Sequence, residues 1–251
     1  MTLLVSPKKV ALVFTTVVLW IILAHVSTGF FKHVLTHDVT LRFFDLDYEN
    51  NLPTWYSSSA LLLCAVLLTG IGLHKRQVGD RYARHWIALA IIFAFLSLDE
   101  MASIHERTIH PLQHLFGLDG YFRLAWVVLG GPFVFILALA YLPLLNGLPR
   151  RTRNQFICAG TLYIGGAVGI EMVGAKYISL YGRGTLMYWN IYTLEESLEM
   201  FGVVVFIYAL VSYMSSCVKE VTFRFDERMP ITPIPALTQS KSAQTINLPA
   251  A

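Results

Sequence analysis

Charged residues are scarce in this sequence, and cysteines are scarcer still. Only 14% of its 251 residues are charged, whereas a soluble domain usually has about 25%. The net charge of +3 is too small to indicate a nucleic-acid-binding surface, so no nucleic-acid partner is expected. The three cysteines form no CxxC pair and no even-numbered framework, which excludes a zinc ribbon and a disulfide scaffold.

Long apolar runs make up most of the chain, because 55% of the residues are hydrophobic. A transmembrane helix needs about 20 consecutive, mainly apolar residues. Six segments meet this requirement: 9–31, 55–73, 86–110, 121–145, 156–178 and 188–214. We therefore predict an all-α fold, a polytopic membrane helix bundle with six transmembrane helices.

Lysine and arginine gather in alternate connecting segments. They are concentrated before residue 10, in the loops at 74–85 and 146–155, and after residue 217. Such segments usually stay in the cytoplasm, so we predict that both termini are cytoplasmic and that the protein lies in a cell membrane, the inner membrane of a bacterium. Residues 1–217 are expected to form the transmembrane domain. Residues 218–251 are polar and proline-containing, which predicts a disordered cytoplasmic tail.

The third segment carries polar residues in its last turns. Proline disfavours helical conformation in the residue before it, so Pro111 is expected to end this helix. One face of a continuous helix over 86–110 would carry Asp99, Ser103, Glu106 and His110. His105 would lie off that face. The pattern therefore predicts a polar stripe that enters the bundle from its outward end.

Carboxylates also occur in the fifth and sixth segments, at similar depth. Counted inward at 1.5 Å per residue, Asp99, Glu171 and Glu196 lie roughly 10 Å below the outer surface, with Glu199 one turn deeper. A charged side chain near the bilayer centre costs roughly 2.5–3.5 kcal/mol on insertion scales. These acids therefore need protons, basic partners, water or a metal ion to compensate them.

A metal site is the favoured interpretation, because carboxylates from several helices with an imidazole are typical ligands of Zn, Fe or Mn. We predict a divalent metal ion of unassigned identity in the outer half of the bilayer. The predicted ligands are Asp99, Glu106, His110, Glu171, Glu196 and Glu199. In an enzyme, Ser103 and Glu106 would be catalytic, and metal-bound water or a metal-activated oxidant would act on a membrane lipid or another apolar substrate.

Two other functions fit the same residues. The carboxylates could serve a proton- or cation-coupled transporter, or they could join helices in a structural subunit that binds a partner membrane subunit. Ser103 fits a helix–helix hydrogen bond as well as a catalytic role. A transporter would need a polar path to the cytoplasm, whereas the inner halves of the predicted helices are mostly apolar, which favours an enzyme or a binding protein.

Overall fold

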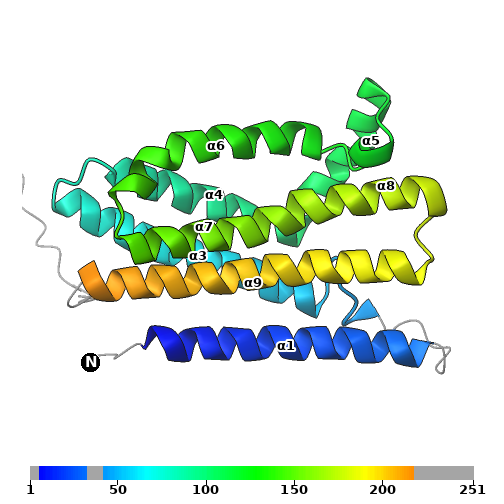
Figure 1. Cartoon of the computed structure of the whole chain (residues 1–251), viewed down its shortest axis with the longest axis horizontal. Coiled ribbons are helices and arrows are strands. Elements are labelled where there is room, and N and C mark those ends of the chain that lie inside the picture. The colour runs from blue at the N-terminus through cyan, green and yellow to red at the C-terminus, as the bar shows by residue number, and fades with distance from the viewer. Residues whose placement is uncertain (1–5, 33–41, 218–251) are drawn as a thin grey trace, which may run out of the picture. The chain divides into compact units, whose positions relative to one another are not determined.

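The computed structural model describes residues 6–32 and 42–217. Within them, six helical stretches are long and apolar enough to cross a membrane, which confirms the predicted all-α bundle and fits an integral membrane protein. These stretches are α1 (Pro7–Lys32), α3 (Leu52–Gln77), α4 (Ala83–Ala102), α6 (Val127–Gly147), the run α7–η2–α8 (Arg150–Ile164, Gly165–Ile170, Glu171–Tyr181) and α9 (Leu186–Cys217) (Figure 1). The predicted disordered tail at 218–251 lies outside the described residues.

Successive spanning helices run in opposite directions, so the bundle has two distinct ends (Figure 1). At one end lie the start of α1, the α3–α4 and α6–α7 turns and the last turn of α9; we call it the basic end. The opposite end holds the α4–α5 link and the α8–α9 turn; we call it the acidic end. The placement of the basic end in the cytoplasm stays a prediction.

The third helix differs from its predicted form. α4 ends at Ala102, Ser103 takes a left-handed conformation (φ 50°, ψ 45°), and a separate helix, α5 (Ile104–Phe116), follows. Pro111 lies inside α5, so the prediction that it ends the third helix is wrong. The predicted shared face of Asp99, Ser103, Glu106 and His110 is also wrong. The chain changes direction at Ser103, so these residues do not lie on one continuous helix.

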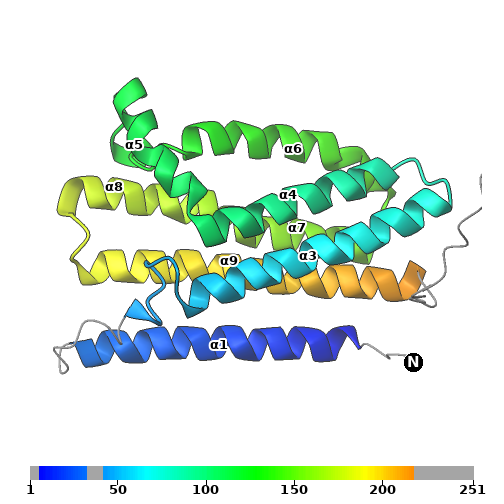
Figure 2. The same cartoon turned by 180° about the vertical axis from the view of Figure 1, so that it is seen from behind.

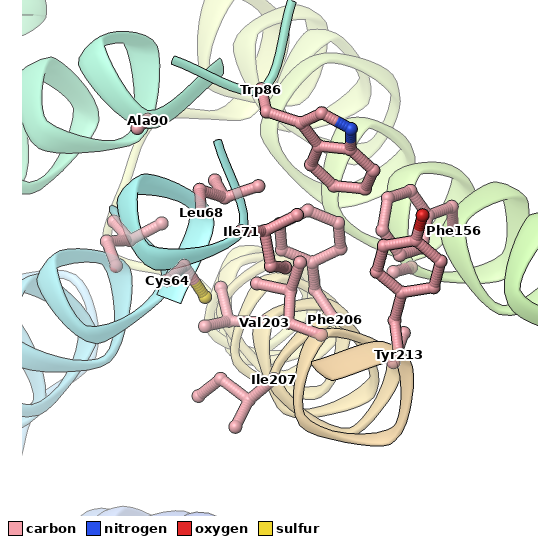
Figure 3. Close-up of a cluster of buried hydrophobic side chains, with 14 of the residues drawn as sticks. Cys64, Leu68, Ile71, Trp86, Ala90, Phe156, Val203, Phe206, Ile207 and Tyr213 are labelled. Carbon is pink, nitrogen blue, oxygen red and sulfur yellow. The ribbon is translucent and has the colours of Figure 1, made fainter. Parts of the chain in front are cut away.

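An apolar core fills the basic half of the bundle, between α3, α4, α7 and α9 (Figure 3). The Trp86 ring stacks on Tyr213, with centroids 5.3 Å apart, and meets Phe156 edge-on at 5.9 Å. Phe206 packs between Phe156 and Phe93, at 4.9 and 4.8 Å. These aromatic contacts give the basic half an apolar interior.

Two glycines let α9 approach the α7–η2–α8 run. A Cβ atom on Gly166 would lie 2.8 Å from the backbone oxygen of Glu195, and one on Gly202 would lie 2.7 Å from the backbone nitrogen of Tyr163. η2 is a short π-helix, a feature that often marks functional sites. The close contact brings Tyr163 and Glu171 next to the carboxylates of α9.

α6 packs loosely against its neighbours along its length. It begins at Val127 rather than at 121, because residues 120–122 form a short 3-10 turn. Near the acidic end, Trp126 Nε1 donates to Glu171 Oε1 at 2.7 Å, and near the basic end the Tyr141 hydroxyl donates to the His85 oxygen at 2.8 Å. α6 is thus attached at its two ends and leaves space beside its middle.

Candidate functional site

A cavity of about 890 Å³ occupies the space beside α6. Its walls come from α4, α6, the α7–η2–α8 run and α9, and the first two turns of α5 and residues 46–49 border its acidic end. Pockets for small molecules usually measure about 300–1,000 Å³. The cavity is therefore large enough for a ligand of considerable size.

Most of the cavity is apolar. Side chains that line this part include Ile92, Phe93, Phe133, Leu137, Phe156 and Phe206. The lining follows α6 from Trp126 to Leu145, which at 1.5 Å per residue is about 28 Å. The hydrocarbon core of a bilayer is about 30 Å thick, so the cavity extends over most of the depth that lipid chains occupy.

The acidic end of the cavity collects carboxylates from separate parts of the chain. Five predicted site residues line it: Asp99, Glu106, Glu171, Glu196 and Glu199. Four further acids, which the prediction did not include, line it as well: Asp47, Glu49, Glu100 and Glu195. Among the described residues, the only Lys, Arg or His side chains in its lining are His105 and Arg183. Negative groups therefore greatly outnumber positive ones at this end.

Two predicted site residues lie elsewhere. Neither Ser103 nor His110 lines the cavity: Ser103 forms the left-handed link, and His110 is exposed on α5. The change of direction at Ser103 carries His110 away from the acids of the other helices. Their catalytic and ligand roles stay predictions without a place in this cavity.

The carboxylates do not converge into a metal-binding arrangement. Over residues 6–32 and 42–217, no group of three or more His, Cys, Asp or Glu side chains is placed to hold a metal ion. Two of the predicted ligands already have protein partners, since Asp99 bonds His105 and Glu171 accepts from Trp126. The geometry therefore gives no support to the predicted metal site, which stays a prediction.

His105 is the functional candidate that the sequence pattern missed. Asp99 Oδ2 lies 2.9 Å from His105 Nδ1, and Asp99 Oδ1 accepts the His105 backbone N–H at 2.8 Å. Burial alone lowers the pKa of His105, but the hydrogen bond and charge of Asp99 outweigh it and raise the pKa to about 9. At neutral pH His105 is therefore an imidazolium ion at the edge of the cavity.

The residues from 42 to 51, which we call the strap, cross the acidic end. Leu46 N donates to His25 Nδ1 at 3.3 Å, and His25 Nε2 lies 3.0 Å from the Thr193 hydroxyl. These contacts fit a neutral imidazole whose proton is on Nε2. The Tyr188 hydroxyl donates to Asp47 at 2.7 Å, so the strap is attached to both α1 and α9.

Glu49 brings a carboxylate of the strap into the cavity. Its Oε2 atom is buried and has no hydrogen-bond partner in the described structure. Burial, and then the negative charge of Glu106, raises the pKa of Glu49. A buried acceptor without a donor is costly, so this oxygen is a place where a proton or a ligand's donor group would be stabilising.

Comparison with known proteins places the chain in a family without giving it an activity. No curated protein and no solved structure matches it. One family model, described as a domain of unknown function (DUF8692), matches residues 11–214, a range that runs from α1 to α9 and includes the whole cavity lining. The chain therefore belongs to the DUF8692 family.

Proposed function

We propose that the protein binds an amphipathic molecule from the membrane, with the apolar chain beside α6 and a positively charged polar group at the acidic end. One observation carries the proposal: a single cavity joins a long apolar stretch to a cluster of carboxylates. A ligand that matches both parts must itself be amphipathic. Lipids and lipid-borne molecules are the amphipathic compounds that a membrane supplies in quantity.

The attachment of α6 supports entry from the lipid. Between its anchors at Trp126 and Tyr141, α6 faces the cavity with apolar side chains such as Phe133 and Leu137. Apolar walls bind a hydrocarbon chain through dispersion contacts with little penalty. A chain that slides between α6 and α4 never has to leave an apolar environment.

Charge supports a cationic polar group. Nine carboxyl groups share the acidic end with one histidine and one arginine. Carboxylates that lose water need a compensating positive charge or a proton. An amine or ammonium group next to Glu196 and Glu199 would supply that charge, whereas a phosphate or sulfate would add repulsion.

A metal-dependent enzyme is the second candidate. Five of the six predicted ligands, all except His110, line this one cavity. A Zn, Fe or Mn ion would neutralise several of them and would activate water or an oxidant against a bound lipid, with Glu106 at hand as an acid–base group. This function requires the side chains of Glu196 and Glu199 to rotate toward a common point.

Transport is less well supported. The cavity extends toward the basic end, but there its lining, with Leu145, Phe156 and Phe206, is apolar. A proton or cation would have to cross this apolar layer, which lacks the chain of polar groups that a relay uses. The apolar basic half favours a protein that binds or converts its ligand within the membrane. A structural subunit would have little use for so large a cavity.

The test compares two glycine variants of the purified protein in lipid nanodiscs. Gly160 lines the cavity, and nothing lies within 4 Å of a Cβ atom built on it, so Gly160→Leu fills open space. Gly169 is equally free of neighbours but is exposed outside the cavity, so Gly169→Leu is the matched control. Binding is followed as thermal stabilisation by a long-chain alkylamine and by an alkyl sulfate of the same length.

We expect the alkylamine to stabilise the native protein and Gly169→Leu, and to have little effect on Gly160→Leu or on the double variant Glu196→Gln, Glu199→Gln. If the alkyl sulfate stabilised the protein as much as the alkylamine, the preference for a positively charged ligand group would be refuted. If the alkylamine stabilised Gly160→Leu as much as the native protein, the cavity would be refuted as the binding site. Elemental analysis of the same samples tests the second candidate. Stoichiometric Zn, Fe or Mn that disappears in the double variant would favour the enzyme.

A further inference from the structure

α5 is an amphipathic helix that lies outside the bundle. Projected at 100° per residue, its polar face carries Glu106, Arg107, His110, Gln113 and His114. Its other face carries Ile104, Thr108, Ile109, Leu112, Leu115 and Phe116, interrupted only by His105, which pairs with Asp99. None of its residues is buried. Ile104, Thr108 and Ile109 border the cavity, but the end of the apolar face at Leu115 and Phe116 is exposed and needs an apolar environment from outside the described chain.

The exposed part of the apolar face is extensive. Leu115 is 72% exposed and Phe116 is 54% exposed, and the turn that follows adds Tyr121 and Phe122, at 51% and 45%. These four side chains belong to one short segment, in which α5 is followed by the 3-10 turn Gly120–Phe122; we call this segment the hairpin. Large apolar groups that gather in this way usually mark an interaction surface.

The position of α5 determines which environment its apolar face meets. Only Ser103 separates α5 from α4, a helix long and apolar enough to cross the membrane, so α5 begins directly at the end of a spanning helix. Figures 1 and 2 both show α5 turned across the direction of the spanning helices. An amphipathic helix that continues a spanning helix and turns sideways lies along the membrane surface.

Contacts to α8 hold the hairpin in this orientation. The Ser179 hydroxyl donates to Asp119 at 3.0 Å, and the Lys176 ammonium lies 5.8 Å from the centre of the Tyr121 ring. Within the hairpin, the Gln113 side chain donates to the Arg123 oxygen. The Asp99 carboxylate fixes the other end by accepting the His105 backbone N–H. The apolar face is therefore presented in a fixed direction.

We propose that α5 docks in the headgroup region of the bilayer at the acidic end, with Leu115 and Phe116 inserted among the acyl chains. The partner is the phospholipid surface of the protein's own membrane. The polar face carries residues of both charge signs, so insertion depends on apolar contact rather than on anionic lipid. The first turns of α5 border the cavity, so the docked helix would lie at the edge of the cavity next to the membrane surface. This last role rests on the proposed function.

Site-directed spin labelling tests the docking in phosphatidylcholine vesicles. Cys158 and Cys217 are replaced by serine, whereas Cys64 is fully buried and can stay. Nitroxide labels are placed in Leu115→Cys and Phe116→Cys, with His110→Cys and His114→Cys as controls on the polar face. Accessibility to lipid-soluble oxygen is compared with accessibility to a water-soluble nickel chelate.

We expect the oxygen-to-nickel accessibility ratio to be several-fold higher at positions 115 and 116 than at 110 and 114, with or without anionic lipid. Equal ratios on the two faces, or nickel-accessible labels at 115 and 116, would overturn the docking. An oxygen-to-nickel ratio that rises only when anionic lipid is present would show that insertion depends on charge and not on apolar contact. The measurement needs no cavity ligand, so failure of the proposed function and failure of the docking give separate results.

Discussion

The carboxylate of Asp99 holds both the ring and the backbone N–H of His105, six residues further along the chain, at 2.9 and 2.8 Å. The pair lies where α4 ends and α5 begins. One oxygen caps the new helix while the other orients an imidazolium ion at the cavity. The same two residues therefore determine both the direction of α5 and the main positive charge next to the acids.

Asp99→Asn tests the charge of this pair. The pKa of His105 rises from its usual 6.5 to about 9 in the folded protein. A raised pKa stabilises the folded state below the usual value, and the gain is lost as the pH rises toward about 9. We expect the melting temperature of the native protein to fall across this window. The asparagine side chain of the variant still caps α5 but carries no charge, so its melting temperature should fall less over the same pH range. An unchanged pH dependence would contradict the role of the Asp99 charge in raising the pKa of His105.

The spanning helices could be predicted because lipid leaves few alternatives. A backbone inside the bilayer must satisfy its own hydrogen bonds, so a long apolar run such as 188–214 has to be helical. The structure places α9 at Leu186–Cys217, and the other predicted runs fall within or near the observed helices. Depth along a helix follows from the residue count, which is why Asp99, Glu171 and Glu196 were assigned to the same level.

The break at Ser103 could not be predicted, because no glycine or proline marks it. Ser103 adopts a left-handed conformation that costs about 1 kcal/mol or more for a residue with a side chain. The carboxylate of Asp99 compensates by capping α5, and this contact exists only after the chain has turned. Proline was the misleading signal, since Pro111 costs α5 one backbone hydrogen bond but does not end it.

His25→Phe tests the attachment of the strap. Phenylalanine keeps the ring that stacks on Trp189, with centroids 5.0 Å apart, but cannot accept the Leu46 N–H. A buried donor without an acceptor costs about 1–3 kcal/mol. We expect a loss of that size in the free energy of unfolding, and faster hydrogen exchange at residues 45–49. His110→Phe, at an exposed position, should change neither the free energy of unfolding nor the exchange rates. If residues 45–49 stayed protected from exchange in both variants, the role of His25 would be disproved.

Trp126→Phe tests how α6 is attached at the acidic end. The change removes the indole N–H that Glu171 accepts and keeps an aromatic ring near His105. Hydrogen bonds between membrane helices contribute about 0.6 kcal/mol on average and about 1.7 at most. We expect a loss within this range and readier labelling of a cysteine placed at Leu137, on the cavity side of α6. Trp55→Phe provides the control, because this side chain is exposed and its indole N–H bonds no group among the described residues.

Gly202→Ala and Gly160→Ala should have opposite effects, although both place a methyl group on a spanning helix. The added carbon on Gly202 would lie 2.7 Å from the backbone nitrogen of Tyr163, an atom that cannot move without shifting α7. Such overpacking costs typically about 1–3 kcal/mol. At Gly160 nothing lies within 4 Å, so alanine should raise stability by up to about 1 kcal/mol through its helix propensity. Denaturant titration in mixed micelles measures both; a destabilised Gly160→Ala would mean that the space beside α6 is already filled by protein, and the cavity on which the proposed function rests would be lost.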